Sequence, residues 1–258
     1  MDEDAPAVES DEKVDSILDG RLRIIQKKTG YRFSLDALLL AYFAGLNEGE
    51  DLIDLGTGSG IVALILAARY PRGRVLGIEI QEQLATMARR NTALNGLDQR
   101  VEIQQGDIRR PETLCAPLSF DVAVFNPPYR RLRSGRMNPN QEKAVARHEV
   151  LSTAADFLAA AGYALREGGR VYTIYPATRM VEILLRMRGC RIEPKRVRMV
   201  HSRPDKAGKF SLVEGVKGGR EELVVLPPLY IYEGMKGYSK EMATIFRELS
   251  ASPAGGGD

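Results

Sequence analysis

One stretch constrains the fold of this chain more than any other. The apolar run Asp51-Leu-Ile-Asp-Leu55 leads at once into Gly56-Thr-Gly-Ser-Gly60, and an apolar helical pattern begins at Ile61. Alternating glycines let the backbone turn sharply and approach a ligand closely, and the helix start behind them offers free backbone N–H groups. The stretch predicts a strand, a ligand-binding turn and a helix, but a turn of this kind alone is compatible with several nucleotide ligands.

The rest of the chain continues this alternation. Apolar, β-branched runs predict strands at residues 51–55, 74–78, 101–105, 121–125 and 170–174, and helical patterns are expected at 61–70, 82–95, 142–165 and 177–188. Such alternation predicts an α/β, doubly wound, Rossmann-like sheet that is mostly parallel. Residues 191–200 and 222–232 read as two strands with a Gly- and Lys-rich loop between them. We expect them to form an antiparallel pair at the C-terminal edge of the sheet.

The ends and the composition set the domain organisation. Residues 1–12 carry six acids and no base and are expected to be disordered. Residues 13–50 form an N-terminal segment, 51–249 the main domain, and the Gly-rich stretch 250–258 a flexible tail. Neither a signal peptide nor a long apolar run is visible, which predicts a cytoplasmic protein without a membrane partner. The two cysteines and two histidines lack metal-ligand spacing, so no metal is expected.

Acidic residues at three successive strand ends narrow the choice of ligand. Glu79 ends the second predicted strand, where a carboxylate can accept both ribose hydroxyls. Asp107 follows the third strand, where it can take an adenine amino group while Ile108 flanks the ring. Asp54 precedes the glycines and is placed to meet the ammonium of a methionine moiety. A nicotinamide dinucleotide would use the first of these acids but would not need Asp107.

The fourth strand stops abruptly at Asn126-Pro-Pro-Tyr129. The two prolines cannot continue a hydrogen-bonded ladder, and Pro127 restricts Asn126 to an extended conformation. A rigid strand exit would be a sufficient structural reason for Pro127 and Pro128. The turn also presents the Asn126 side-chain oxygen and the Pro127 carbonyl as two fixed acceptors, which match the two N–H donors of an exocyclic amine. Tyr129 offers a flat face to a planar group.

The distribution of charge suggests a polyanionic partner. Residues 186–220 hold eleven basic and three acidic side chains, and a second cluster of bases follows the Asn-Pro-Pro-Tyr turn. An exposed, solvated surface explains such charges equally well, but a basic face beside the site also suits RNA phosphates. The residues expected to contact RNA are Arg130, Arg131, Arg133, Arg136, Arg147, Lys206 and Lys209.

Taken in this order, the glycine turn, the acids and Asn126-Pro-Pro-Tyr129 resemble the class I methyltransferases that modify amino groups. Further stretches resemble the bacterial tRNA adenine-N6-methyltransferases that act beside the anticodon of a valine tRNA. These stretches are Gly30-Tyr-Arg-Phe-Ser-Leu-Asp-Ala-Leu-Leu-Leu40, Ser134-Gly-Arg-Met-Asn-Pro-Asn140, Ala146-Arg-His-Glu149, and Glu214-Gly-Val-Lys-Gly-Gly219 before Leu226-Pro-Pro-Leu-Tyr230. The resemblance spans residues 20–235.

This resemblance implies S-adenosyl-L-methionine as cofactor, S-adenosyl-L-homocysteine as product and an RNA substrate, most naturally a tRNA. Residues 51–249 would then be the methyltransferase domain, with 13–50 covering the cofactor site. The implied catalytic residues are Asn126, Pro127, Pro128 and Tyr129. The implied cofactor-binding residues are Asp36, Asp54, Gly56, Thr57, Gly58, Gly60, Glu79, Ile80, Asp107, Ile108 and Asn126.

Two alternatives remain open at this point. Protein glutamine-N5-methyltransferases also use Asn-Pro-Pro-Tyr, although they usually carry a helical recognition domain, and only about fifty residues precede the glycine turn here. A catalytically silent RNA-binding module would keep the cofactor pocket for structural reasons, which the intact Asn126 and Tyr129 argue against. No obligate protein partner is evident in the sequence.

Overall fold

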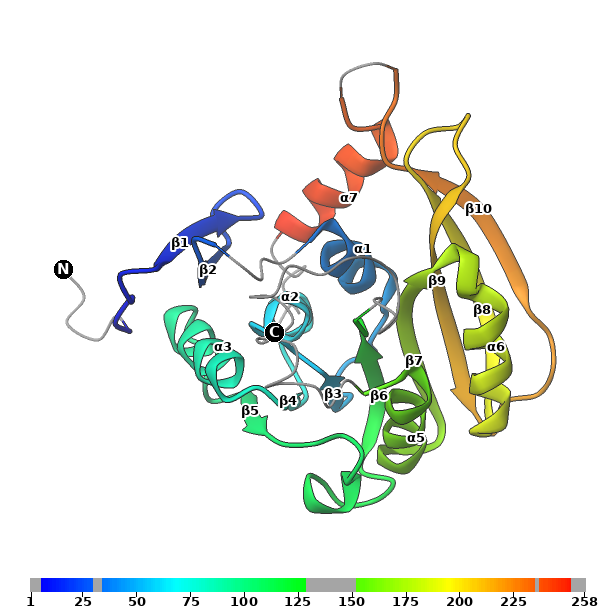
Figure 1. The fold of residues 1–258 in the computed structure, drawn as a ribbon, viewed down its shortest axis with the longest axis horizontal. Coiled ribbons are helices and arrows are strands. Elements are labelled where there is room, and N and C mark those ends of the chain that lie inside the picture. Colours follow the sequence, from blue (N-terminus) through cyan, green and yellow to red (C-terminus); the bar gives the residue numbers. More distant parts are fainter. Residues whose placement is uncertain (1–5, 30–33, 129–151, 235–236, 252–258) are drawn as a thin grey trace, which may run out of the picture.

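The computed structural model describes residues 6–29, 34–128, 152–234 and 237–251. A β-hairpin precedes a large sheet covered by helices (Figure 1). The elements in chain order are β1 Glu12–Ile17, β2 Leu22–Lys27, α1 Leu35–Phe43, β3 Leu52–Leu55, α2 Ile61–Arg69, β4 Val75–Glu79, α3 Glu82–Leu94, β5 Val101–Gln105, η1 Pro111–Thr113, β6 Phe120–Phe125, α5 Ala154–Ala164, β7 Leu165–Pro176, η2 Ala177–Arg179, α6 Met180–Gly189, β8 Ile192–His201, β9 Gly208–Lys217, β10 Val224–Tyr230 and α7 Lys240–Ser250.

The large sheet has eight strands in the order β10-β8-β9-β7-β6-β3-β4-β5. Strands β5, β4, β3, β6 and β7 run parallel, and β9 is antiparallel to both β7 and β8. The predicted fold class, a mostly parallel Rossmann-like sheet with antiparallel C-terminal strands, is confirmed. Strand order reverses between β3 and β6, and ligands of open α/β sheets bind outside the carboxyl ends of the strands at such a point.

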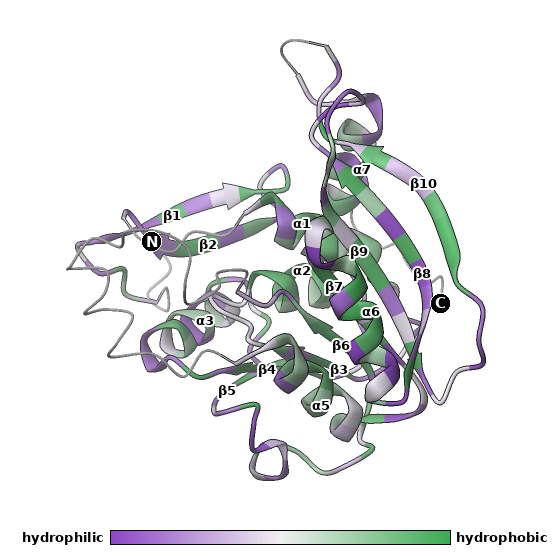
Figure 2. Ribbon diagram, turned by 45° about the vertical axis from the view of Figure 1, so that its right-hand side comes forward, coloured by the Kyte–Doolittle hydropathy of each residue, from purple (hydrophilic) through white to green (hydrophobic). Residues whose placement is uncertain are grey.

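Two hydrophobic layers pack on the two faces of the sheet. Helices α1, α2 and α3 cover one face, and α5 and α6 cover the other (Figure 1). All four residues of β3 are buried, and so are residues 61–67 of α2, because the central strands and this helix are covered all round. Hydropathy colouring shows the same division, with apolar central strands and a more polar β1 (Figure 2). None of the helices in the described ranges is long and apolar enough to cross a membrane.

The predicted pairing of the C-terminal strands is wrong in detail. Strand β10 lies beside β8 in parallel, and the antiparallel partner of β8 is β9, within the stretch that the sequence suggested to be a loop. The sequence suggested a loop because this stretch is rich in glycine and lysine. A side chain at Gly215 would lie 2.3 Å from the Met187 Cε atom of α6, so the glycine allows the strand to pack closely under the helix.

Two other predicted boundaries are wrong. The acidic tail was expected to be disordered through Glu12, but Glu12 begins β1 and its side chain is buried. The helix predicted at 142–165 begins only at Ala154 within the described residues. Thr153 has extended dihedral angles and forms a capping box with Asp156, which fixes the helix start. Residues 142–151 lie outside the described ranges.

Candidate active site

The glycine turn connects β3 to α2 at the carboxyl edge of the sheet. Gly56, Gly58 and Gly60 have φ angles of 70°, 60° and 86°, a region that other residues rarely adopt. A side chain at Gly56 would also lie 2.9 Å from the Phe157 ring of α5. The sequence therefore places glycines here for both conformation and space, and the turn leaves its backbone open to a ligand.

Asp54, in β3, stabilises this turn through its side chain. Its carboxylate accepts a hydrogen bond from the Thr57 hydroxyl at 2.6 Å, and the side chain is almost completely buried. Burial raises the pKa of the Asp54 carboxyl to about 7, with the neighbouring Glu79 adding to the shift. Asp54 was predicted to meet a ligand ammonium, but its position suits a role in holding the turn.

Glu79 joins the end of β4 to the glycine turn. One carboxylate oxygen accepts from the Gly58 N–H and the other from the Gln81 N–H, both at 2.9 Å. Burial raises the pKa of the Glu79 carboxyl, while these backbone donors oppose the shift. The carboxylate retains acceptor capacity, so it can also receive a hydroxyl group of a ligand.

A pocket of about 230 Å³ opens beside these groups. Seven predicted residues line it: Gly56, Gly58, Glu79, Ile80, Ile108, Asn126 and Pro128. Six lining residues were not predicted: Ile78, Gln81, Leu84, Gly106, Ser152 and Phe157. Most of these six follow the carboxyl end of a strand or lie in the first turn of the next helix. That position was the sequence signal that could have identified them.

The Asn-Pro-Pro turn borders the same pocket. Leu55 and Phe125 are partners in adjacent parallel strands. The glycine turn follows Leu55 and Asn126 follows Phe125, so the two start side by side. Phe125 is fully buried and packs on Phe157 with ring centroids 5.3 Å apart. Asn126 and Pro128 line the pocket, and Pro127 is buried beside them. Tyr129 lies outside the described residues.

Several predicted cofactor residues do not line the pocket. Thr57 and Gly60 belong to the turn but are not among the residues that line the pocket. Asp107 lies between two lining residues, yet its carboxylate accepts from the Arg109 guanidinium at 2.9 and 3.0 Å, which holds the pKa of Asp107 below its usual range. Asp36 is in the first turn of α1, where burial raises the pKa of its carboxyl.

Only two of the predicted RNA-contacting residues can be placed. Lys206 is exposed in the turn between β8 and β9 and forms an ion pair with Asp205 at 2.9 Å. Lys209 is exposed near the start of β9, with its ammonium 5.1 Å from the centre of the Phe210 ring. The residues outside the described ranges are Arg130, Arg131, Arg133, Arg136 and Arg147.

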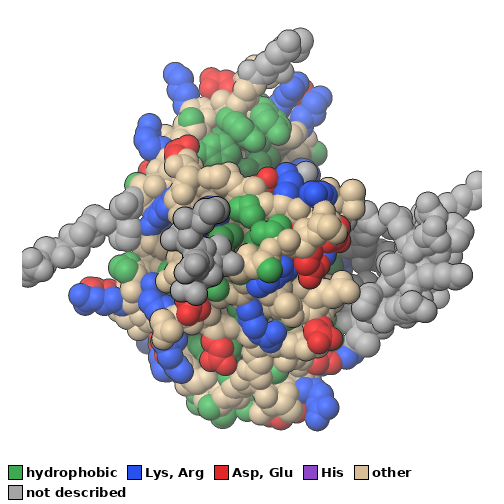
Figure 3. Space-filling model, turned by 90° about the vertical axis from the view of Figure 1, so that its left-hand side faces the viewer, with side chains coloured by type: hydrophobic (Ala, Val, Ile, Leu, Met, Phe, Trp, Pro, Cys, Tyr) green, Lys and Arg blue, Asp and Glu red, His purple; other side chains and the backbone are tan. Residues whose placement is uncertain are grey.

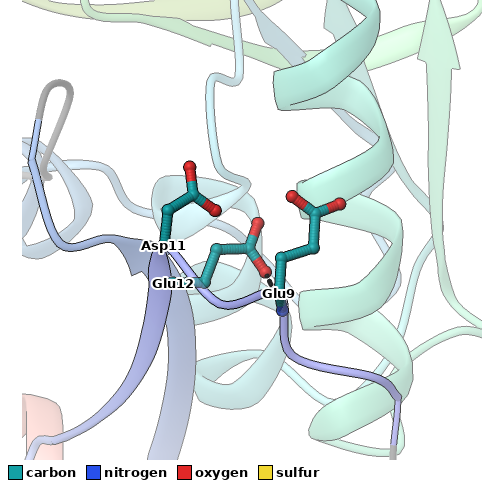
Figure 4. Close-up of side chains that lie close together, drawn as sticks. All are labelled: Glu9, Asp11 and Glu12. Atoms are coloured by element: carbon teal, nitrogen blue, oxygen red, sulfur yellow. Dashed lines mark hydrogen bonds between the residues drawn. The ribbon is translucent and has the colours of Figure 1, made fainter.

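Three acidic side chains gather at the N-terminal hairpin, away from the pocket. Glu9, Asp11 and Glu12 lie close enough to hold a cation (Figure 4). The Lys27 ammonium is 3.0 Å from both Glu9 and Asp11 and 3.4 Å from Glu12, and Arg90 pairs with Glu12 at 2.6 Å. These two bases supply the positive charge, so the cluster forms an ion-pair network.

Comparison with known proteins identifies relatives of this chain. The model of a methyltransferase domain family matches residues 46–205. A tRNA1(Val) (adenine(37)-N6)-methyltransferase from Porphyromonas gingivalis is 33% identical over 200 residues, which cover 75% of this chain and 78% of the relative. An enzyme of the same name from Pedobacter heparinus is 33% identical over 156 residues, covering 60% and 64% of the two chains.

Solved structures share the fold. A predicted O-methyltransferase from Agrobacterium tumefaciens superimposes with a TM-score of 0.69, covering 84% of this chain and 98% of its own, at 23% identity. The geranyl diphosphate C-methyltransferase of Streptomyces coelicolor, solved with S-adenosyl-L-homocysteine, has a TM-score of 0.53 at 15% identity, covering 71% and 80%. At these identities the likeness concerns the fold, which is that of S-adenosylmethionine-dependent methyltransferases.

Proposed function

The chain belongs to the family of tRNA1(Val) (adenine(37)-N6)-methyltransferases, and we propose that it methylates the exocyclic N6 amine of an adenine in tRNA, beside the anticodon. The proposal rests on one observation, that the glycine turn and Asn126 line the same pocket. They follow the adjacent strands β3 and β6. A methyl donor held by the first would face an amine held by the second.

The pocket suits S-adenosylmethionine. The Glu79 carboxylate accepts from backbone N–H groups of Gly58, Gln81 and Ile80, and its two oxygens offer about four acceptor sites, which leaves capacity for a ribose hydroxyl. Ile80, which is 40% exposed, and buried Ile108 provide apolar surface for the adenine ring. Gly56 and Gly58 let the backbone approach the methionine portion. We assign Asp54 and Thr57 to support of the turn, and Asp36 to the segment that leads over the site.

The residues of the catalytic turn position the acceptor. When bound, S-adenosylmethionine supplies an electrophilic methyl group. The Asn126 side-chain oxygen and the Pro127 carbonyl each accept one N–H of the adenine amine, which orients its nitrogen and returns electron density to it. Tyr129, which follows in the sequence, offers a ring to stack on the base once it is turned out. No strong general base is needed, because the proton leaves after transfer, and orientation can contribute up to roughly 7–11 kcal/mol.

Labelling distinguishes this function from methylation of a protein. Purified protein and donor with a labelled methyl group are incubated with tRNA that lacks the modification and, separately, with a release factor. We expect label in the tRNA only. Label in the release factor instead would support a glutamine-N5-methyltransferase, and label in neither would contradict the proposal.

A further inference from the structure

Two exposed tyrosines stack on one another beyond the end of β10. The ring centroids of Tyr232 and Tyr238 are 5.5 Å apart with an angle of 18° between the ring planes, and the two residues form an antiparallel bridge. Tyr232 is 39% exposed and Tyr238 is 51% exposed. Large aromatic surface left in water at a loop is a feature of binding sites.

The surrounding structure fixes this tyrosine pair. Tyr238 contacts the Phe246 ring of α7 edge-on at 4.9 Å. The Tyr232 N–H donates to the Ser202 carbonyl at 2.9 Å, and the Ile231 N–H donates to the His201 carbonyl at 2.9 Å. The pair is therefore held between α7 and the turn that follows β8. Tyr238 has a packing role in this arrangement, while the described contacts of the Tyr232 ring are with Tyr238.

The turn beside Tyr232 is basic. Residues 202–209 contain Arg203, Lys206 and Lys209 against a single acid, Asp205. Lys206 and Lys209 are both exposed. In Figure 3, hydrophobic side chains gather near the top of this face of the molecule, with Lys and Arg side chains to either side and some acidic side chains among them. Exposed aromatic rings flanked by cations are what proteins present to single-stranded nucleic acid, because bases stack on the rings while phosphates meet the cations.

This surface lies at the same edge of the sheet as the pocket. Strands β8 and β10 end there, in parallel with each other, and they are three and four positions from β6 in the strand order. At about 4.8 Å per strand, the sideways separation from the Asn126 turn is about 14–19 Å. The register places Phe125 level with Val197, so the end of β8 lies a further four residues, roughly 13 Å, along the strand direction. Lys209 also acts electrostatically on Asp36 at the start of α1, so the basic turn approaches the segment that leads over the site.

We propose that Tyr232, Tyr238 and the turn at residues 202–209 form a second RNA contact, on which an unpaired base of the substrate stacks against Tyr232 while adjacent phosphates meet Arg203 and Lys206. This inference rests on the proposed function, since it assigns a role to part of the same RNA. The contact would set the affinity for tRNA and leave the cofactor pocket unchanged.

Substitution of Tyr232 tests the stacking contact. In Tyr232→Leu we expect the KM for tRNA to rise roughly 5- to 150-fold, the range that loss of one base–aromatic stack of about 1–3 kcal/mol produces. The kcat and the Kd for S-adenosylhomocysteine should stay near wild type. Tyr232→Phe keeps the ring and should restore the KM. Tyr163→Leu is the matched control and should leave the KM unchanged, because Tyr163 lies at the C-terminal end of α5, where its carbonyl accepts from the Leu118 N–H just before β6.

A charge substitution tests the phosphate contact independently. Lys206→Ala should reduce the dependence of log Kd for tRNA on log salt by about 0.7–0.9, the value for one phosphate contact. Lys195→Ala, near the other end of β8, is its control, because Lys195 donates to backbone carbonyls of residues 220 and 221. An unchanged salt dependence in Lys206→Ala, together with an unchanged KM in Tyr232→Leu, would overturn the inference.

The failure of this inference and of the proposed function can be told apart. tRNA binding is also measured with S-adenosylhomocysteine present, when no methyl transfer occurs. If the wild type methylates tRNA and every variant is equally active, only the second RNA contact is wrong. If Tyr232→Leu weakens tRNA binding but the wild type methylates no adenine, the proposed function is wrong and the second RNA contact stands.

Discussion

The side chain of Asn91 donates a hydrogen bond to the Ser59 carbonyl of the glycine turn at 2.9 Å. The same amide pairs with both backbone groups of Ile25 in β2, accepting at 2.7 Å and donating at 3.1 Å, and it is fully buried. One side chain of α3 therefore joins the N-terminal hairpin to the glycine turn. One helical turn later, Asn95 pairs in the same way with Arg23, at an exposed position.

The first prediction concerns this bridge. Asn91→Leu leaves three backbone groups without a partner in the interior and should lower the free energy of unfolding by about 2–4 kcal/mol. It should also weaken binding of S-adenosylhomocysteine, because the Ser59 segment loses its support. Asn95→Leu is the control and should cost less than about 1 kcal/mol, since water can replace its bonds. Thermal unfolding and calorimetric titration check both, and equal effects of the two variants would contradict the bridge.

The second prediction concerns Glu79. In Glu79→Gln, an amide NH₂ group replaces one of the two carboxylate oxygens. In the wild type that oxygen accepts from the N–H of Gly58 or Gln81, so in the variant two hydrogen-bond donors oppose each other. Loss of a hydrogen bond to a charged group costs about 1.5–3 kcal/mol, which corresponds to a roughly 10- to 150-fold higher Kd for S-adenosylhomocysteine. Asp107→Asn, at a carboxylate paired with Arg109, should have a smaller effect. A Kd within twofold of wild type in Glu79→Gln would count against this assignment.

The third prediction is a pH dependence that arises from Asp54. The pKa of its carboxyl is about 7 in the folded protein, against 3.8 for an unperturbed aspartate. Between these values the folded protein holds a proton that the unfolded chain has released, so this contribution to stability is present at low pH and is lost as the pH rises towards 7. Asp54→Asn should flatten the decline of the unfolding free energy between pH 4 and 8. Superimposable pH profiles for the two proteins would refute the assignment.

The fourth prediction concerns the opposite end of the pH range. The Arg90 guanidinium lowers the pKa of the buried Glu12 carboxyl to about 2. This pair therefore stabilises the fold above about pH 4.5, and the contribution is lost as the pH falls towards 2. Glu12→Gln should lower the unfolding free energy by about 3 kcal/mol at pH 7, with a difference that shrinks in acid. Asp11→Asn, at an exposed carboxylate, should change little, and a matching loss in both variants would contradict this account.

The parts of the fold that follow from local pattern were predictable. Strands β3, β4 and β6 are largely apolar, buried runs, and the glycine turn, Glu79 and Asn126 stand at their carboxyl ends. In a parallel sheet these ends share one edge, so the sequence order alone brings them together.

Features that depend on distant contacts were not predictable. The hairpin β1–β2 was not predicted, because its two short strands mix charged and apolar residues and its place depends on distant contacts. Leu22 and Ile24 join the hydrophobic core, and Arg90 and Asn91 of α3 bind Glu12 and Ile25. Strand β9 was missed because its stretch is rich in glycine and lysine, and Gly215 is required by the approach of α6. Phe157 was missed because the helix was predicted to span 142–165, which placed this residue in the helix interior. In the structure it lies in the first turn of α5 and packs on Phe125.

The most direct test of the central claim combines Asn126→Ala with nucleoside analysis. Wild type and variant are incubated with unmodified tRNA and S-adenosylmethionine, the digested nucleosides are analysed by mass spectrometry, and the Kd for S-adenosylhomocysteine is measured in parallel. We predict N6-methyladenosine with the wild type and almost none with the variant, at a Kd near that of wild type. Undiminished N6-methyladenosine from Asn126→Ala, or a different modified nucleoside from the wild type, would contradict the account.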